Sequence, residues 1–203
     1  IILEDDCLPS QSFFWFCEEL LERYKDDLQV GQISGDNFQN GIKRGGADYY
    51  FSVYAHIWGW ASWANRWKNY DVELDTINDI NFIKNLFQNK NTQSYWLKIF
   101  RNMKMKKIDT WDYQWIFTLW NNNQLTVLPN INLIENIGFG EDATHTMNAE
   151  SEFAKLKPFE LILKSHPRDI NQDKDADNFT SKLMFSKKPF FTRIINKIKR
   201  LIK

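Results

Sequence analysis

The sequence has little cysteine, no net charge and no long apolar run, and each of these absences excludes a class of protein. Cys7 and Cys17 have neither the spacing nor the histidine partners of a zinc site, and two cysteines are too few for a disulfide scaffold. No run of about 18 apolar residues, the length that crosses a membrane, occurs in the 203 residues. We therefore expect a globular chain with a buried core in a reducing compartment.

Several catalytic motifs are also missing. The sequence contains no GxxxxGK[ST], no GxGxxG after a strand, no GxSxG and no HExxH. These absences exclude nucleotide hydrolysis through a P-loop, dinucleotide redox chemistry, hydrolysis by a serine triad and zinc proteolysis of the HExxH type.

The charges balance in number but are unevenly distributed. The chain holds 26 basic and 26 acidic residues, which removes a general electrostatic argument for a nucleic-acid partner. Eight of the basic residues and none of the acidic ones lie in 178–203, which leaves 18 basic against 26 acidic residues, a net charge of −8, in 1–177. The sequence thus predicts an acidic body with a basic tail.

The spacing of apolar residues predicts an α/β chain with a mixed sheet flanked by helices. The opening residues 1–3 are typical of a buried strand, and Ser12 is expected to cap a helix that ends near Tyr24. Further strands are expected over 29–34, 49–54 and, around Pro129, twice within 124–134. Helices are expected over 60–67, 80–89, 95–106 and 109–121, and the glycine-rich segment 40–48 is expected to be a mobile loop.

The C-terminal part has a different pattern. We expect one domain over 1–164, a charged linker over 165–180 and a basic amphipathic helix over 181–203. Apolar residues recur at helical spacing from Phe190 to Ile202, and Lys and Arg occupy most positions between them. Such a helix favours the surface of an anionic membrane. The alternative is a terminal helix that packs on the domain and exposes its charges to water.

Three consecutive acids, Glu4, Asp5 and Asp6, follow the first predicted strand. Open α/β sheets bind ligands beyond the carboxyl ends of their strands, and neighbouring carboxylates repel unless a cation lies among them. The pattern is typical of a site for Mg²⁺ or Mn²⁺ that also contacts substrate phosphates. The alternative is that these acids only interact with the dipole of the following helix.

A second candidate site is the segment 109–115, in which Asp109 and Asp112 stand among tryptophans. A carboxylate with a raised proton affinity is suited to act as a general base on a hydroxyl. The spacing of the two acids is also that of a capping box at a helix start. The nine tryptophans invite a carbohydrate interpretation, but we expect most of them in the core, and we interpret His56 and His145 as structural and His166 as a surface residue.

Five sequence blocks, in order, resemble bacterial glycosyltransferases of the GT-A fold, which use nucleotide-diphospho-sugars in surface polysaccharide synthesis. The blocks span residues 1–146 and read LEDDCLPSQSFFWFCEELLERY, ISGDNF, HIWGWASWANRWKNYD, DTWDYQW and NIGFGEDATHT. More distantly, the chain is similar to the N-acetylglucosaminyltransferase I type, which shares the EDD, a P-x-x-FF helix, a Trp-Asp pair and a later FG…H block.

The resemblance implies a divalent-metal-dependent, inverting transferase of sugar to a hydroxyl acceptor, either a carbohydrate or a lipid-linked molecule. It implies that Asp6, with Asp5, holds Mn²⁺ or Mg²⁺, and that Asp112 deprotonates the acceptor. Because Tyr113 stands where the family has a second acid, Asp109 remains a rival base. Donor-binding residues would be Glu4, Asp5, Asp6, Gly138, Gly140 and His145, and residues near the sugar and acceptor would be Trp58, Trp60, Trp63 and Trp111. The basic tail would then place the enzyme in the cytoplasm, at the inner face of the plasma membrane.

The family builds its nucleoside pocket from elements that precede the EDD strand. Since this sequence begins at that strand, we expect it to be the carboxyl-terminal part of a transferase. The alternative function is a non-catalytic carbohydrate-binding or scaffold module that lacks the donor-binding half.

Overall fold

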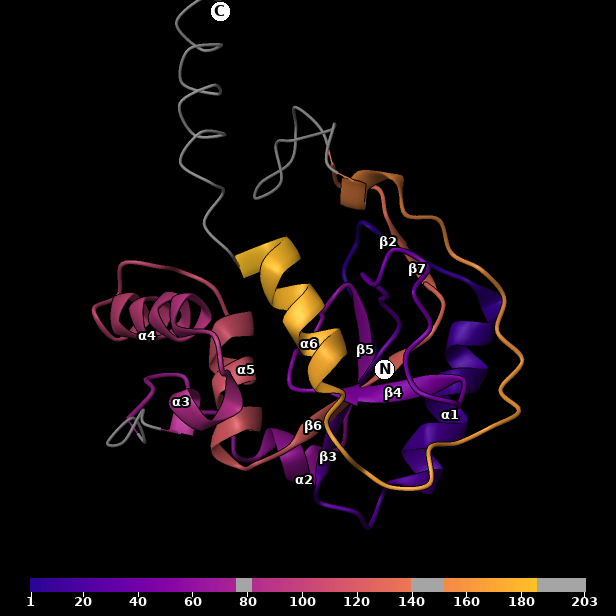
Figure 1. The fold of residues 1–203 in the computed structure, drawn as a ribbon, viewed down its shortest axis with the longest axis horizontal. Coiled ribbons are helices and arrows are strands. Elements are labelled where there is room, and N and C mark those ends of the chain that lie inside the picture. The colour runs from indigo at the N-terminus through magenta and orange to yellow at the C-terminus, as the bar shows by residue number, and fades with distance from the viewer. Residues whose placement is uncertain (76–81, 140–151, 186–203) are drawn as a thin grey trace, which may run out of the picture.

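A mixed sheet lies at the centre of the computed structural model, which describes residues 1–75, 82–139 and 152–185 (Figure 1). Its strand order is β1-β5-β3-β6-β4; β3 and β6 run parallel, and the other neighbours run antiparallel. The strands of this sheet are β1 (Ile2–Leu3), β3 (Val30–Ser34), β4 (Tyr49–Ser52), β5 (Gly59–Ala61) and β6 (Leu125–Pro129). A second, two-stranded sheet pairs β2 (Cys7–Pro9) with β7 (Ile134–Asn136). The mixed sheet was predicted, and it is confirmed.

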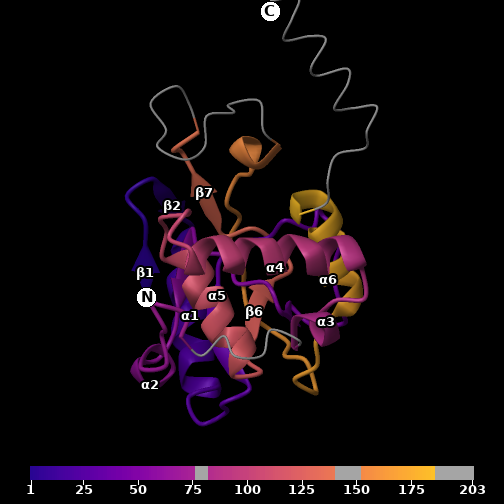
Figure 2. The ribbon, with the colours of Figure 1, turned by 90° about the vertical axis from the view of Figure 1, so that its left-hand side faces the viewer.

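Helices cover both faces of the central sheet. They are α1 (Gln11–Arg23), α2 (Ala64–Trp67), α3 (Phe82–Leu86), α4 (Lys90–Lys104), α5 (Asp112–Asn121) and α6 (Lys174–Thr180), with short helical turns η1 (Glu152–Lys155) and η2 (Ser181–Phe185). Helix α1 packs on one face and forms a core with side chains of β3 and β4, whereas α3, α4 and α5 gather on the other side (Figures 1 and 2). The chain is therefore an α/β fold with a mixed sheet flanked by helices. No helix within the described ranges has the length and apolar character needed to cross a bilayer.

Helix α1 follows the predicted periodicity. Phe13, Phe16 and Leu20, which are spaced three and four residues apart, are all buried against the sheet. The helix begins one residue before the expected cap Ser12. Ser12 therefore lies inside the first turn and does not cap the helix. Its hydroxyl accepts a hydrogen bond from Leu161 N at 2.8 Å.

The prediction of a buried first strand is wrong. Strand β1 lies at the edge of the sheet, where it pairs with β5, and the exposed fractions of Ile1, Ile2 and Leu3 are 53%, 45% and 37%. An apolar run of three residues indicates a strand but carries no information about its place in the sheet.

The prediction of one helix over 60–67 is wrong for its first half. Trp60 lies in β5, and α2 begins only at Ala64. Short helices and strands share many sequence patterns, so the tryptophan spacing alone did not separate them. Helix α2 carries the buried Arg66, whose guanidinium donates to the carbonyl oxygens of Tyr24 and Asp27 at 3.0 and 2.9 Å, beyond the end of α1.

The segment 165–180, which we expected to be a linker, instead packs on the domain. Its helix α6 places Asp177 against β4, where the carboxylate accepts hydrogen bonds from Ser52 Oγ at 2.5 Å and from Val53 N at 3.2 Å. The many charges suggested a solvated segment, but Ala176, Asp177 and Thr180 of α6 are buried. Residues 186–203 of the predicted tail lie outside the described residues.

Candidate functional site

Glu4, Asp6 and Cys7 form a compact acidic cluster where β1 ends and β2 begins. One ligand atom from each of these three side chains lies within 4.8 Å of the others. The hydrogen bond from Cys7 N to Glu4 O, at 3.1 Å, closes the turn that brings them together. Two carboxylates this close repel each other unless a cation or a proton lies between them. Asp5 is exposed and lies outside this cluster.

Strand β7, which pairs with β2, holds the carboxylate of Asp6 in place. Asn136 Nδ2 donates to Asp6 Oδ1 at 3.3 Å, and Ile137 N donates to Asp6 O at 2.8 Å. A β-carbon at Gly138 would lie only 1.9 Å from Asp6 Oδ2, so any larger residue at this position would push the Asp6 carboxylate aside. The structure thus brings together Asp6 and Gly138, two predicted site residues that are far apart in the sequence.

Cys7 adds a thiol to the cluster. Burial, and then the hydrogen bond from Sγ to Asp6 Oδ1 at 3.4 Å, raises the pKa of the Cys7 thiol well above its usual range. The thiol stays protonated at neutral pH and is a poor ligand for a hard cation, which prefers oxygen. Glu4 and Asp6 are therefore the residues of the cluster that fit Mg²⁺ or Mn²⁺.

Asp36 is a buried acid near this cluster to which the sequence analysis gave no role. It directly follows Gly35 at the end of β3, and its side chain is completely buried. Asp36 Oδ2 accepts hydrogen bonds from Trp58 N at 3.2 Å and from Ser34 Oγ at 3.4 Å, whereas Oδ1 has no hydrogen-bond partner among the described residues. Burial raises the pKa of Asp36 to about 8; the two hydrogen bonds lower it, and the charge of Glu4 raises it. The sequence feature that could have pointed to Asp36 is an acid shortly after a predicted strand, the same pattern as in Glu4 to Asp6.

Trp58 belongs to an aromatic wall near Asp36. Its half-buried ring meets Phe38 edge-on with centroids 5.1 Å apart and meets Phe139 with centroids 5.7 Å apart. Phe38 also contacts Phe153 and His56, at 5.1 and 4.5 Å. Burial lowers the pKa of His56 to about 3, so this imidazole is neutral at physiological pH and serves the packing of the wall.

Trp60, which the resemblance placed near the sugar, is a core residue. Its exposed fraction is 1%, and its ring stacks on that of Trp111 at a centroid distance of 5.8 Å and an angle of 22°. Trp67 and Trp115 tilt against the same ring at 5.9 and 5.7 Å. The expectation that Trp60 contacts a sugar is therefore corrected, because no free face of the ring remains. Trp111 is half-buried on the outer side of this stack.

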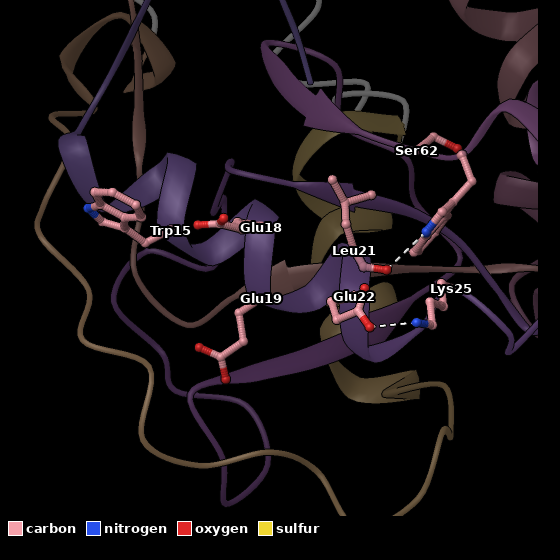
Figure 3. Close-up of a pocket in the computed structure, with 8 residues that line it drawn as sticks. Trp15, Glu18, Glu19, Leu21, Glu22, Lys25 and Ser62 are labelled. Atoms are coloured by element: carbon pink, nitrogen blue, oxygen red, sulfur yellow. Dashed lines mark hydrogen bonds and ion pairs between the residues drawn. The ribbon is translucent and has the colours of Figure 1, made fainter.

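Trp63 lines a groove along α1, whose other lining residues are labelled in Figure 3. Its Nε1 donates to Leu21 O at 3.0 Å, and the guanidinium of Arg66 lies 4.4 Å from its ring centroid. The 62% exposed Trp15 lines the same groove. The polar residues that line it are Glu18, Glu19, Glu22, Lys25 and Ser62.

Asp112, the first predicted base, is the first residue of α5 and is half-buried. The hydroxyl of Thr110 donates to its carboxylate. Asp109 is exposed, and the helix begins without a side-chain cap among the described residues, so the capping box is not formed. Trp111, the residue before Asp112, stacks on Trp60, and Trp60 pairs in register with Ile2, two residues before Glu4.

Gly140 and His145, which the resemblance assigned to a loop over the diphosphate, lie outside the described residues. No protein-family model matches this sequence, and no curated protein matches it.

Proposed function

We propose that this chain carries the metal and diphosphate site of a GT-A-type glycosyltransferase, which moves a sugar from a nucleotide-diphospho-sugar to a hydroxyl acceptor. The observation that supports it is the pairing of Glu4 and Asp6 in one cluster with Gly138 directly against Asp6. This cluster follows β1, and open α/β sheets bind ligands beyond such strand ends. The carboxylates alone would repel a diphosphate, so the proposal requires a cation.

The donor set fits a hard divalent ion. Glu4 and Asp6 would hold Mn²⁺ or Mg²⁺, with Asp5 beside them, and the ion would supply positive charge against the diphosphate leaving group. Asn136 orients the Asp6 carboxylate through its amide, and such outer contacts fix the direction of a ligand oxygen. Gly138 leaves the space that this carboxylate occupies.

Asp112 is our candidate for the base, with Asp109 as its rival. The acceptor hydroxyl oxygen would attack the anomeric carbon as the bond from that carbon to the diphosphate oxygen breaks, and the hydroxyl proton would pass to the carboxylate of Asp112. In-line attack gives inversion at the anomeric carbon, and most of the rate would come from positioning and charge neutralisation. Trp58, next to Phe139, is a half-buried ring of the aromatic wall that is suited to stack on a sugar ring.

The acceptor would be a carbohydrate or a lipid-linked molecule of surface polysaccharide or glycolipid synthesis. The basic residues of 181–203 would hold the protein at the inner face of the plasma membrane, where anionic lipids attract each nearby Lys or Arg by roughly 1 kcal/mol. This arrangement would present the acidic site to acceptors in the same membrane.

The experiment that tests this function is binding of nucleotide-diphospho-sugars to the chain, measured calorimetrically with Mn²⁺ and again with a chelator. We expect binding that requires the ion and that Asp6→Asn abolishes. Asp26→Asn, which removes the same charge from an exposed position, is the matched control. Binding that is indifferent to both the chelator and Asp6→Asn would contradict the proposal.

A non-catalytic carbohydrate-binding module is the second candidate, and the groove along α1 favours it. Exposed tryptophan rings and carboxylates, as at Trp15 and Glu18, are suited to stack on sugar rings and to accept hydrogen bonds from their hydroxyls (Figure 3). Oligosaccharide binding that needs no metal and that Trp15→Ala abolishes, without any nucleotide-sugar binding, would favour this module over the transferase.

A further inference from the structure

Arg44 lines a hollow that lies apart from the acidic cluster. Three segments form this hollow: the loop before β4, the residues that precede α4, and helix α6 with the turn η2. Its volume is about 490 Å³, and it is lined by Arg44, Gln88, Asn89, Asp175, Asn178, Phe179 and Lys182. Helix α6 brings Phe179 to the hollow, and Lys182 comes from η2, the last described element before 186–203.

The backbone of Arg44 is held in place by a single side chain. Asn130 Oδ1 accepts a hydrogen bond from Arg44 N at 2.7 Å, and Asn130 Nδ2 donates to Arg44 O at 2.8 Å and to Ala47 O at 2.9 Å. The loop over 40–48, which we expected to be mobile because of its glycines, is therefore fixed to the end of β6 at this point. Arg44 is thus carried on an ordered backbone.

The side chain of Arg44 is fixed as well. Its Nε donates to Gln39 Oε1 at 2.8 Å, and its guanidinium lies 5.4 Å from the ring centroid of Phe179. Gln39 is itself buried, and its Nε2 donates to Thr180 Oγ1 at 2.9 Å. Nε of the guanidinium is thus occupied by protein, whereas no hydrogen bond of its two terminal amino groups occurs among the described residues.

A guanidinium held this firmly would be expected to face a carboxylate, but Arg44 forms no ion pair among the described residues. Asp175 also lines the hollow, so the arrangement is not a purely basic patch. The remaining lining residues near Arg44 are a second cation, Lys182, and the amides of Asn178, Gln88 and Asn89. Two cations with neutral amide donors are the groups that bind a phosphate, and the planar fork of arginine matches its oxygens.

From this arrangement we propose that the Arg44 hollow is a binding site for a phosphate group. Arg44 provides two parallel N–H donors, Lys182 provides the second positive charge, and Asn178 provides a neutral donor. The ordering of Arg44 by Asn130 and Gln39 lowers the entropy that binding costs. The phosphate belongs either to the headgroup of an anionic lipid or to a small phosphorylated molecule in solution. This site is independent of the proposed transferase activity, because none of its residues lies in the acidic cluster.

The test uses the full chain and two probes, inorganic phosphate in solution and vesicles of phosphatidylcholine with or without phosphatidic acid. Arg44→Gln and Lys182→Gln are compared with Lys43→Gln, which removes the same charge from the neighbouring exposed residue, outside the hollow. We expect Arg44→Gln to weaken phosphate binding by at least about tenfold, as for loss of a charged hydrogen-bond partner. Near-ultraviolet circular dichroism verifies that each variant keeps the fold.

The two probes separate the sources of the phosphate. If Arg44→Gln and Lys182→Gln weaken both phosphate binding and sedimentation with phosphatidic acid vesicles more than Lys43→Gln does, the site takes a lipid headgroup. If they weaken only the binding of free phosphate, it takes a soluble phosphorylated molecule. If the wild type does not bind phosphate, or if all three variants behave alike, the proposal is overturned. Each of these outcomes can be interpreted even if the acidic cluster does not bind a nucleotide-sugar.

Discussion

Gly138 passes so close to Asp6 that a β-carbon on the glycine would lie 1.9 Å from a carboxylate oxygen. A backbone segment that follows β7 therefore determines where the acid that follows β1 can point. Since Asn136, two residues before Gly138, donates to the same carboxylate, position and orientation are set by one short stretch of chain.

We expect Gly138→Ala to displace the Asp6 carboxylate and to weaken Mn²⁺-dependent nucleotide-sugar binding by about tenfold or more, in the range found for loss of outer contacts to a metal ligand. Isothermal titration of the donor in the presence of Mn²⁺ measures this effect. Gly46→Ala is the control, because nothing lies within 4 Å of a β-carbon there. Equal binding by the two variants would show that the contact has no role in the site.

Asp36→Asn should make the protein more stable at pH 8 and change its stability little at pH 4. The pKa of Asp36 is raised from 3.8 to about 8, so the folded state holds this proton more tightly than the unfolded state does. The contribution of Asp36 to the free energy of unfolding is therefore most favourable below about pH 4, and it declines as the pH rises to about 8.

Urea unfolding of both proteins at the two pH values measures this difference, which we expect to reach roughly 2 to 5 kcal/mol at pH 8. Comparison of the two proteins at one pH removes the contributions of other titrating groups, such as Asp177, whose pKa burial raises to about 6. A stability difference that is the same at both pH values would mean that Asp36 does not titrate in this range.

Asp112→Asn should slow sugar transfer by at least about a hundredfold while nucleotide-sugar binding is retained, as expected for loss of a general base. The amide keeps the size of the side chain and its contact with Thr110 but cannot take a proton. Single-turnover transfer with a bound donor and an added hydroxyl acceptor measures the rate. The parallel Asp109→Asn variant decides between the two acids: if only that change abolishes transfer, Asp109 is the base.

Trp60→Ala and Trp58→Ala should separate core packing from ligand contact. Trp60 is buried in a stack of four tryptophans, so its truncation should lower the free energy of unfolding by about 3 to 5 kcal/mol. Trp58 is half-buried at the aromatic wall, so its truncation should cost less stability and should weaken sugar binding. Thermal unfolding and donor titration of both variants measure these effects. If Trp60→Ala weakened sugar binding and Trp58→Ala did not, Trp60 rather than Trp58 would contact the sugar.

The sequence predicted those features in which local spacing and burial agree. The buried positions of α1 repeat at helical spacing, so its inner face could be derived from Phe13, Phe16 and Leu20 alone. Trp60 and Trp58 have the same residue type and neighbouring positions, yet one is core and the other is half-buried, because tertiary packing brings Trp67 of α2 and Trp115 of α5 against Trp60 alone.

The candidate site was predictable only where the acids stand together. Glu4 and Asp6 could be assigned to one cluster because a short turn connects them. The unpaired oxygen of Asp36 depends on Trp58 and on the packing around the end of β3, which no local pattern encodes. The docking of α6 was missed for a similar reason, since the hydrogen bonds of Asp177 to β4 join segments that are distant along the chain.

The attachment of α6 to β4 has a mechanical consequence. Asp177 accepts hydrogen bonds from Ser52 Oγ and Val53 N, which holds α6 against the sheet. The turn η2 follows α6 directly, and its Lys182 lines the same hollow as Arg44. A force that pulls on η2 is therefore carried to β4 by the hydrogen bonds of Asp177 rather than absorbed by a flexible linker.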